Sequence, residues 1–269
     1  MIRNRESEIP GGIAVALVAA GSEARVLDTI EALTGNGETT VSCIVIEDAD
    51  MLRAAKLPFA IEVCRATNIV RRIDSGNLEE TLRERAAKTI QLVRKATEGM
   101  NVNWTFDIVR KKTAAALLEL VASRDVTLFC SAATFRTHEP AGPRPGSGWQ
   151  GVGTNGNTVV VVLDRSAAST RAIEVARRIA RRRNMSLKPI IVAASTGGSE
   201  RIKTRIDRAG DPVADVATTL LSPSFAEIAA RVREQQPAAL VLPVSQLKGS
   251  VARILELEYG IDCPAAIVK

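Results

Sequence analysis

The chain has 269 residues, of which 46% are apolar, 3% are aromatic and 25% are charged, with a net charge of +6. The length corresponds to about two ordinary domains, and the apolar fraction is typical of a globular chain. No apolar run approaches the length of a membrane span, and a mild positive charge alone is weak evidence for a nucleic acid partner.

Cysteine and histidine usage argues against a metal centre. The four cysteines include no CxxC pair, and the single histidine, His138, lies in a stretch rich in Pro and Gly. We therefore expect buried thiols in a reducing compartment and no structural zinc site.

The first apolar run covers residues 13–20, after a polar leader at residues 1–12. It resembles the core of a secretory signal peptide, but Glu6 and Glu8 precede it where a signal peptide is basic. We interpret the run as the first core strand and expect a soluble cytoplasmic protein.

Residues 13–136 predict a first α/β domain. Apolar runs predict strands, and apolar residues at helical spacing predict the helices between them. The predicted elements are a strand at 13–19, a helix at 24–33, a strand at 40–46, a long helix capped by Asn77 with Glu80, a strand at 102–109, a helix at 113–123 and a strand at 126–130. The alternating pattern around Trp104 indicates a strand near a sheet edge.

Residues 50–72 interrupt this order. Apolar residues from Met51 to Phe59 indicate a helix that is broken at Pro58, and a second short apolar segment follows it. We expect this insertion either to cover a sheet edge or to form a surface for a partner.

Residues 137–157 are rich in Gly, Pro, Ser and Asn and predict a linker. The pattern then restarts in a second domain, residues 158–269. Its first strand, residues 158–163, has no polar face, which predicts a central strand that is covered on both sides. The further predicted elements are a helix at 167–183, a strand at 187–194, a polar crossover at 195–213, a strand at 214–221, a helix from a capping box at Ser224 to 235, a strand at 238–244, a helix at 249–258 and a strand at 265–268.

The two halves repeat the same order of elements, which indicates a tandem duplication. The pattern resembles the universal stress protein family in its tandem two-domain form. Asp164 and Ser166 after TVVVVL, Gly249 and Ser250 in LKGSVARIL, and Cys263 before the last strand carry this resemblance. The resemblance implies two flavodoxin-like (Rossmann-like) α/β domains with parallel sheets of strand order 3-2-1-4-5, packed as an intramolecular pseudo-dimer.

Nucleotide-binding members of that family hold ATP between strands 1 and 4, with an aspartate after strand 1 and a glycine loop after strand 4. In the first half Ala20 stands at the aspartate position, which implies that this half binds no nucleotide. In the second half Asp164 is in place, Arg165 replaces a glycine, and two earlier glycines of the loop are absent.

The resemblance therefore implies a site for ATP or another adenine nucleotide in the second half only. We predict no metal ion. The candidate residues are Asp164, Arg165, Ser166, Lys248, Gly249 and Ser250, with Ser245 and Gln246 nearby. A carboxylate can accept hydrogen bonds from a ribose, and a helix N-terminus beside a lysine can bind phosphate. The alternative is that these residues only cap two helices.

Three other patterns have structural interpretations. The GxGxxG matches between Gly146 and Gly156 precede a strand and belong to the linker. The stretch STGGS at residues 195–199 predicts a turn. Five arginines between Arg177 and Arg183 lie on the exposed side of a predicted helix, which favours a solvated face over an acidic partner or nucleic acid.

No catalytic constellation is recognisable. We therefore expect a non-enzymatic regulatory or sensory binding module of the cytoplasm, in the stress-response class, with an unidentified protein partner and no membrane or nucleic acid partner. A homo-oligomer is compatible with the sequence. A weak ATPase or nucleotide-dependent switch is one alternative, and a nucleotide-independent scaffold that docks a protein through residues 50–72 is the other.

Overall fold

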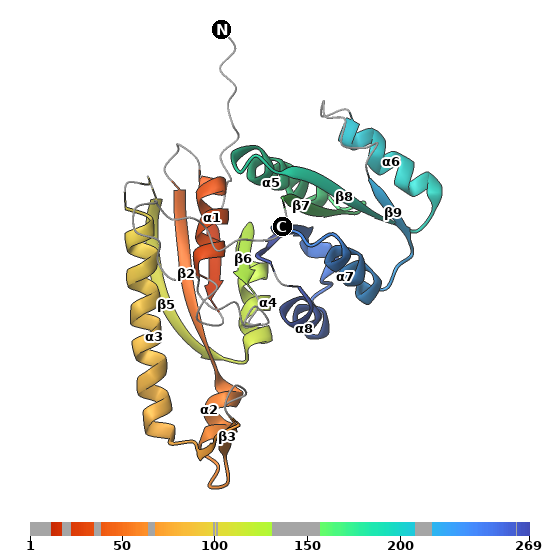
Figure 1. The fold of residues 1–269 in the computed structure, drawn as a ribbon. Coiled ribbons are helices and arrows are strands. Elements are labelled where there is room, and N and C mark those ends of the chain that lie inside the picture. Colours follow the sequence, from red (N-terminus) through yellow and green to blue (C-terminus); the bar gives the residue numbers. More distant parts are fainter. Residues whose placement is uncertain are drawn as a thin grey trace.

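A computed structural model describes residues 12–17, 23–34, 39–63, 68–98, 100, 102–130, 157–207, 217–261 and 263–269. One nine-stranded sheet runs through both halves, in the order β5-β2-β1-β6-β11-β10-β7-β8-β9 (Figure 1). The first half supplies β1 (Ile13–Leu17), β2 (Thr39–Asp48), β5 (Val102–Lys111) and β6 (Val126–Cys130). The second half supplies β7 (Thr158–Leu163), β8 (Ser186–Ala193), β9 (Thr218–Leu221), β10 (Ala239–Pro243) and β11 (Ala265–Val268).

Helices cover both faces of this sheet. One buried apolar cluster includes residues of α1 (Glu23–Thr34), α3 (Ser75–Ala96), α5 (Ala168–Arg182) and α6 (Thr196–Asp207). The other includes residues of α4 (Thr113–Ser123), α7 (Phe225–Glu234) and α8 (Val251–Gly260). Successive side chains of a strand point to opposite faces, so the valines of β7 alternate between the two clusters. Burial on both faces explains why this strand has no polar side.

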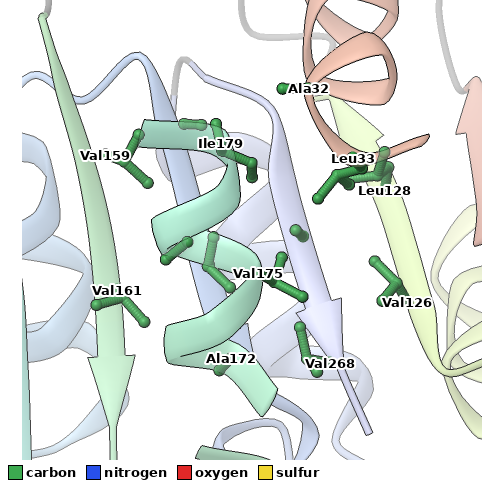
Figure 2. Packing of buried hydrophobic residues seen from close by; sticks show 14 of the residues in the cluster. Ala32, Leu33, Val126, Leu128, Val159, Val161, Ala172, Val175, Ile179 and Val268 are labelled. Atoms are coloured by element: carbon green, nitrogen blue, oxygen red, sulfur yellow. The ribbon is translucent and has the colours of Figure 1, made fainter. Parts of the chain in front are cut away.

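The two halves join in the middle of the sheet. Strands β6 and β11 pair antiparallel, with Phe129 opposite Ala265 and Val126 opposite Val268, whereas all the other neighbours in this sheet are parallel. The backbone N–H of Lys269 donates to the carbonyl oxygen of Asp125 over 2.9 Å and extends this pairing. Figure 2 shows Val126 and Val268 side by side in one continuous apolar cluster that also includes residues of α1 and α5.

The strand order confirms the flavodoxin-like fold class. The second half has the order 3-2-1-4-5, as β9-β8-β7-β10-β11. The first half has the order 3-2-1-4, as β5-β2-β1-β6, and β11 of the second half lies where a fifth strand of the first half would lie. The two halves therefore share one strand.

Two local predictions are wrong. Helix α3 is capped by Asp74, whose side chain accepts a hydrogen bond from the backbone N–H of Gly76 over 2.9 Å, and Asn77 lies inside the helix. Residues 196–207 form helix α6, which includes most of the predicted turn at residues 195–199. Two glycines weaken the local helical signal, but Ile202 and Ile206 are buried one turn apart, so packing on the sheet stabilises the helix.

The insertion consists of a short helix and a hairpin. Helix α2 (Ala49–Ala55) is followed by β3 (Ile61–Val63) and β4 (Val70–Arg72), which pair antiparallel in a separate two-stranded sheet. This hairpin lies at the lower end of the molecule in Figure 1, beyond α2 and away from the large sheet. The predicted leader, except Gly12, and the predicted linker, except Asn157, lie outside the described residues.

Candidate functional site

The carboxyl ends of β7 and β10 bring together two polar segments. The two strands are parallel neighbours, with Val161 opposite Val241, so the residues that follow them meet at one edge of the sheet. Asp164 and Ser166 come from β7, and a 3-10 turn after β10 (Val244–Gln246) supplies Ser245 and Gln246. Ligands of open α/β sheets bind at this kind of edge, which makes it the candidate site.

Asp164 is surrounded by hydrogen-bond donors of its own chain. Its Oδ1 accepts from the backbone N–H of Ser166 over 2.8 Å, from Ser166 Oγ over 2.5 Å and from Ser169 Oγ over 2.7 Å. Its Oδ2 accepts from Ser245 Oγ over 2.5 Å and from Gln246 Nε2 over 2.7 Å. We call these five residues the Asp164 cluster.

The donors keep Asp164 ionised. Burial raises the pKa of this carboxyl group, but the hydrogen bonds from Ser166, Ser245 and Ser169 outweigh it and leave the pKa below its usual value. An ionised carboxylate that already accepts five hydrogen bonds is a weak base and has few lone pairs left for a ligand. The arrangement favours a structural role for the charge.

Gln246 connects the Asp164 cluster to α8. It is buried, and its backbone carbonyl oxygen accepts a hydrogen bond from Arg253 Nη1 of α8. The guanidinium of Arg253 also lies over the ring of Phe225, 5.3 Å from its centroid. Asp164 thus connects the end of β7 through the β10 loop to α7 and α8.

The other predicted site residues lie apart from this cluster. Lys248 and Gly249 are exposed and both have positive φ angles, +49° and +66°. Ser250 occupies the N-cap position of α8, but its side chain makes no capping hydrogen bond. Arg165 is exposed, and its guanidinium lies against Gly198 in the first turn of α6, where an added Cβ would be 3.0 Å from Nη2.

The six predicted site residues thus do not lie together in the structure. Asp164 and Ser166 share one cluster, and Arg165 extends toward α6. The turn after β10 carries Lys248, Gly249 and Ser250. Ser169 belongs to the cluster but was missed in the sequence. Its only signal is a serine spacing, Asp-x-Ser-x-x-Ser, that brings a hydroxyl from the first turn of α5 back to the carboxylate.

The first half has acidic residues at the corresponding edge, and they have local roles. Asp48 caps α2 by accepting from the backbone N–H of Asp50 over 2.7 Å, and it also accepts from Thr113 Oγ1 over 2.8 Å. Glu47 is buried and accepts from Arg110 Nε over 2.6 Å. The segment after β1, with Ala20, lies outside the described residues.

Two residues of the arginine cluster, Arg178 and Arg183, contact the first half. Arg178 Nη1 donates to the carbonyl oxygen of Leu33 over 3.1 Å, and Arg183 Nη2 lies 3.3 Å from Asp28 Oδ2. Both acceptors belong to α1, and Leu33 lies in its last turn, where carbonyl groups lack helical partners and the helix dipole favours cations. For these arginines the prediction of a solvated face is wrong.

Neither a metal centre nor a bilayer span is present in the part of the chain that the structure describes. Its His, Cys, Asp and Glu side chains form no group of three or more that could hold a metal ion. None of its helices combines the length and the apolar character that crossing a bilayer requires.

Comparison with known proteins identifies the fold. No protein-family model matches the chain, and no curated protein matches it in sequence. A universal stress protein from Archaeoglobus fulgidus DSM 4304 is similar in structure, with a TM-score of 0.50 at 12% identity over 95% of this chain and 96% of that chain. A functionally unknown protein from Pseudomonas aeruginosa PAO1 has a TM-score of 0.47 at 12% identity, over 97% of this chain and 94% of that chain. The likeness to the Archaeoglobus protein shows that the chain has the fold of universal stress proteins along nearly its whole length.

Proposed function

We propose that this chain is a non-catalytic regulatory binding module that acts through contact surfaces and without a bound adenine nucleotide. The observation that supports the proposal is the Asp164 cluster. A ribose hydroxyl or an adenine amine that donated to Asp164 would have to displace a serine or Gln246, each of which already lies within 2.8 Å of the carboxylate.

The chemistry of the cluster also supports a non-enzymatic role. Three serine hydroxyls donate to Asp164, but an ionised carboxylate of lowered pKa is a poor base for activating a nucleophile. The thiols of Cys43 and Cys263 are buried in the core, and we propose the reducing cytoplasm as the compartment.

Adenine-nucleotide binding in the second half is the second candidate function. It is favoured by the exposed turn before α8, where Lys248 and Gly249 adopt left-handed conformations beside a helix N-terminus. A nucleotide held there would be bound mainly by its phosphates and not through Asp164. A weak ATPase or a nucleotide-dependent switch would require this binding as its first step.

Calorimetric titration with ATP and ADP, with and without magnesium, tests the proposal. We expect no saturable heat at millimolar nucleotide and the same melting temperature with and without it. Saturable binding that is lost in Lys248→Ala and retained in Arg233→Ala, an exposed cation on α7, would establish the second candidate instead. Nucleotide at a hundred times its Kd stabilises a protein by about 2.7 kcal/mol, so binding would be visible in a thermal melt.

A further inference from the structure

The hairpin of the insertion carries a group of exposed apolar side chains. Five of them are more than half exposed, Phe59 most of all at 73%. They are Phe59, Ile61, Val63, Ile69 and Val70. We call the described residues 57–63 and 68–73 the tip. Surface apolar residues are normally scattered, so a group of this kind on a single hairpin indicates a contact surface.

Three of these apolar residues, Ile61, Val63 and Val70, lie on one face of the hairpin. Ile61 lies opposite Arg72 and Val63 opposite Val70, so these four side chains share one face of the hairpin. An isolated two-stranded hairpin is marginally stable in water, and β3 and β4 form a sheet of their own, so a contact outside the chain would stabilise the tip.

The charge of residues 57–73, which include the tip, indicates what kind of partner would bind it. Residues 57–73 contain three arginines and one glutamate, a net charge of +2. A second copy of the chain would bring two positive tips together, whereas an anionic surface would attract them. An anionic bilayer offers a negatively charged surface for the arginines and an apolar layer for the side chains beside them.

We propose that the tip binds anionic lipid membranes by inserting its apolar side chains shallowly into the interfacial layer. Arg72 lies on the same face as Ile61 and is exposed, so it can contact lipid phosphates while the apolar side chains are buried. The open strand edges keep the backbone at a hydrated depth. This proposal departs from the expectation of no membrane partner, and the contact needs no spanning segment.

The inference rests on the proposed function, because it names the surface through which a nucleotide-independent module would act. The experiment is co-sedimentation of the full chain with vesicles of equal parts phosphatidylglycerol and phosphatidylcholine, compared with phosphatidylcholine alone. Wild type should bind the anionic vesicles, less so at high salt, and the neutral vesicles weakly. The double variant Phe59→Asp/Val70→Asp should lose at least about tenfold in partitioning.

A matched control is Leu221→Asp, because Leu221 is 50% exposed at the end of β9, outside the tip. It should bind vesicles as wild type does. If the double variant melts early, Phe59→Trp replaces it, and its added fluorescence should shift to the blue with anionic vesicles. Arg72→Gln should weaken binding to the anionic vesicles and reduce its dependence on salt.

The proposal is overturned if wild type does not bind anionic vesicles at low salt, or if the double variant binds them equally well. It is also overturned if wild type forms a dimer that the double variant does not form while neither binds vesicles, because a second copy is then the occupant. Vesicle binding and nucleotide titration are separate measurements, so failure of this inference is distinguishable from failure of the proposed function.

Discussion

Arg178 of α5 donates a hydrogen bond over 3.1 Å to the carbonyl oxygen of Leu33, the penultimate residue of α1. This contact joins the two halves through their helices, as the pairing of β6 with β11 joins them through the sheet. Arg183 reinforces it with the Asp28 carboxylate. We infer that the halves unfold together and not as independent domains.

Replacing Arg178 tests this contact. Arg178→Ala should lower the free energy of unfolding by about 1.5–3 kcal/mol, because it removes a charge-assisted hydrogen bond to a helix terminus. Urea unfolding measures the change. Arg233→Ala, on the exposed side of α7, should stay within about 0.5 kcal/mol of wild type. If both substitutions changed the free energy of unfolding equally, the hydrogen bond from Arg178 to Leu33 would not contribute to stability as we propose.

The shared strand β11 provides a second test. Ile267 is buried, with 2% exposed, and pairs with Leu242 on one side and Thr127 on the other. Ile267→Ala should cost about 2–5 kcal/mol and keep one unfolding transition. Two separate transitions, with the first half unaffected, would show that the halves do not depend on the shared strand.

Neutralising Asp164 should destabilise the protein. Asp164→Asn leaves Ser166, Ser169 and Ser245 without the charge that they share and places an amide group among donors, so we expect a loss of about 2–4 kcal/mol. Asp107→Asn on the exposed side of β5 is the matched control. A tolerated Asp164→Asn substitution, judged by chemical unfolding, would mean that the cluster contributes little to stability.

The acid stability of the protein should depend on the same residue. Because hydrogen bonds lower the pKa of Asp164 in the folded state, its contribution is present above the unfolded-state pKa of about 3.9 and is lost as pH falls through the lower folded value. Asp28 has the opposite effect on stability. Burial raises its pKa more than Arg183 lowers it, so protonation of Asp28 at low pH favours the folded state. The free energy of unfolding should therefore fall less between about pH 5 and pH 2 in Asp164→Asn than in wild type. Identical pH profiles would contradict this prediction.

The central strands could be predicted from the sequence because their physical signal is local. Residues 159–163 are apolar without a break, and the structure buries all of them. The position of Asp164 and Ser166 also follows, since polar residues that end a central parallel strand lie at one edge of the sheet. The same local reasoning identified the capping box of Ser224 and Glu227.

Long-range features were not predictable in this way. An arginine on the polar side of a helix looks the same in sequence whether it faces water or a carbonyl oxygen, and Leu33 is 145 residues away from Arg178. The saturation of Asp164 depends on Ser245 and Gln246, which approach it only after the sheet has formed. Helix α6 depends on packing of Ile202 and Ile206 and not on its own propensity.

The claim that the Asp164 cluster binds no adenine nucleotide is tested most directly by amide hydrogen exchange. The segments to measure are the β7 and β10 loops, residues 164–169 and 244–250, with and without millimolar MgATP. We predict that the Ser166 amide, which donates to Asp164, is protected without nucleotide and that ATP changes the exchange rates of neither loop. Rapid exchange of both loops in the absence of ATP, followed by protection when ATP is added, would contradict it and would establish this edge as a nucleotide site.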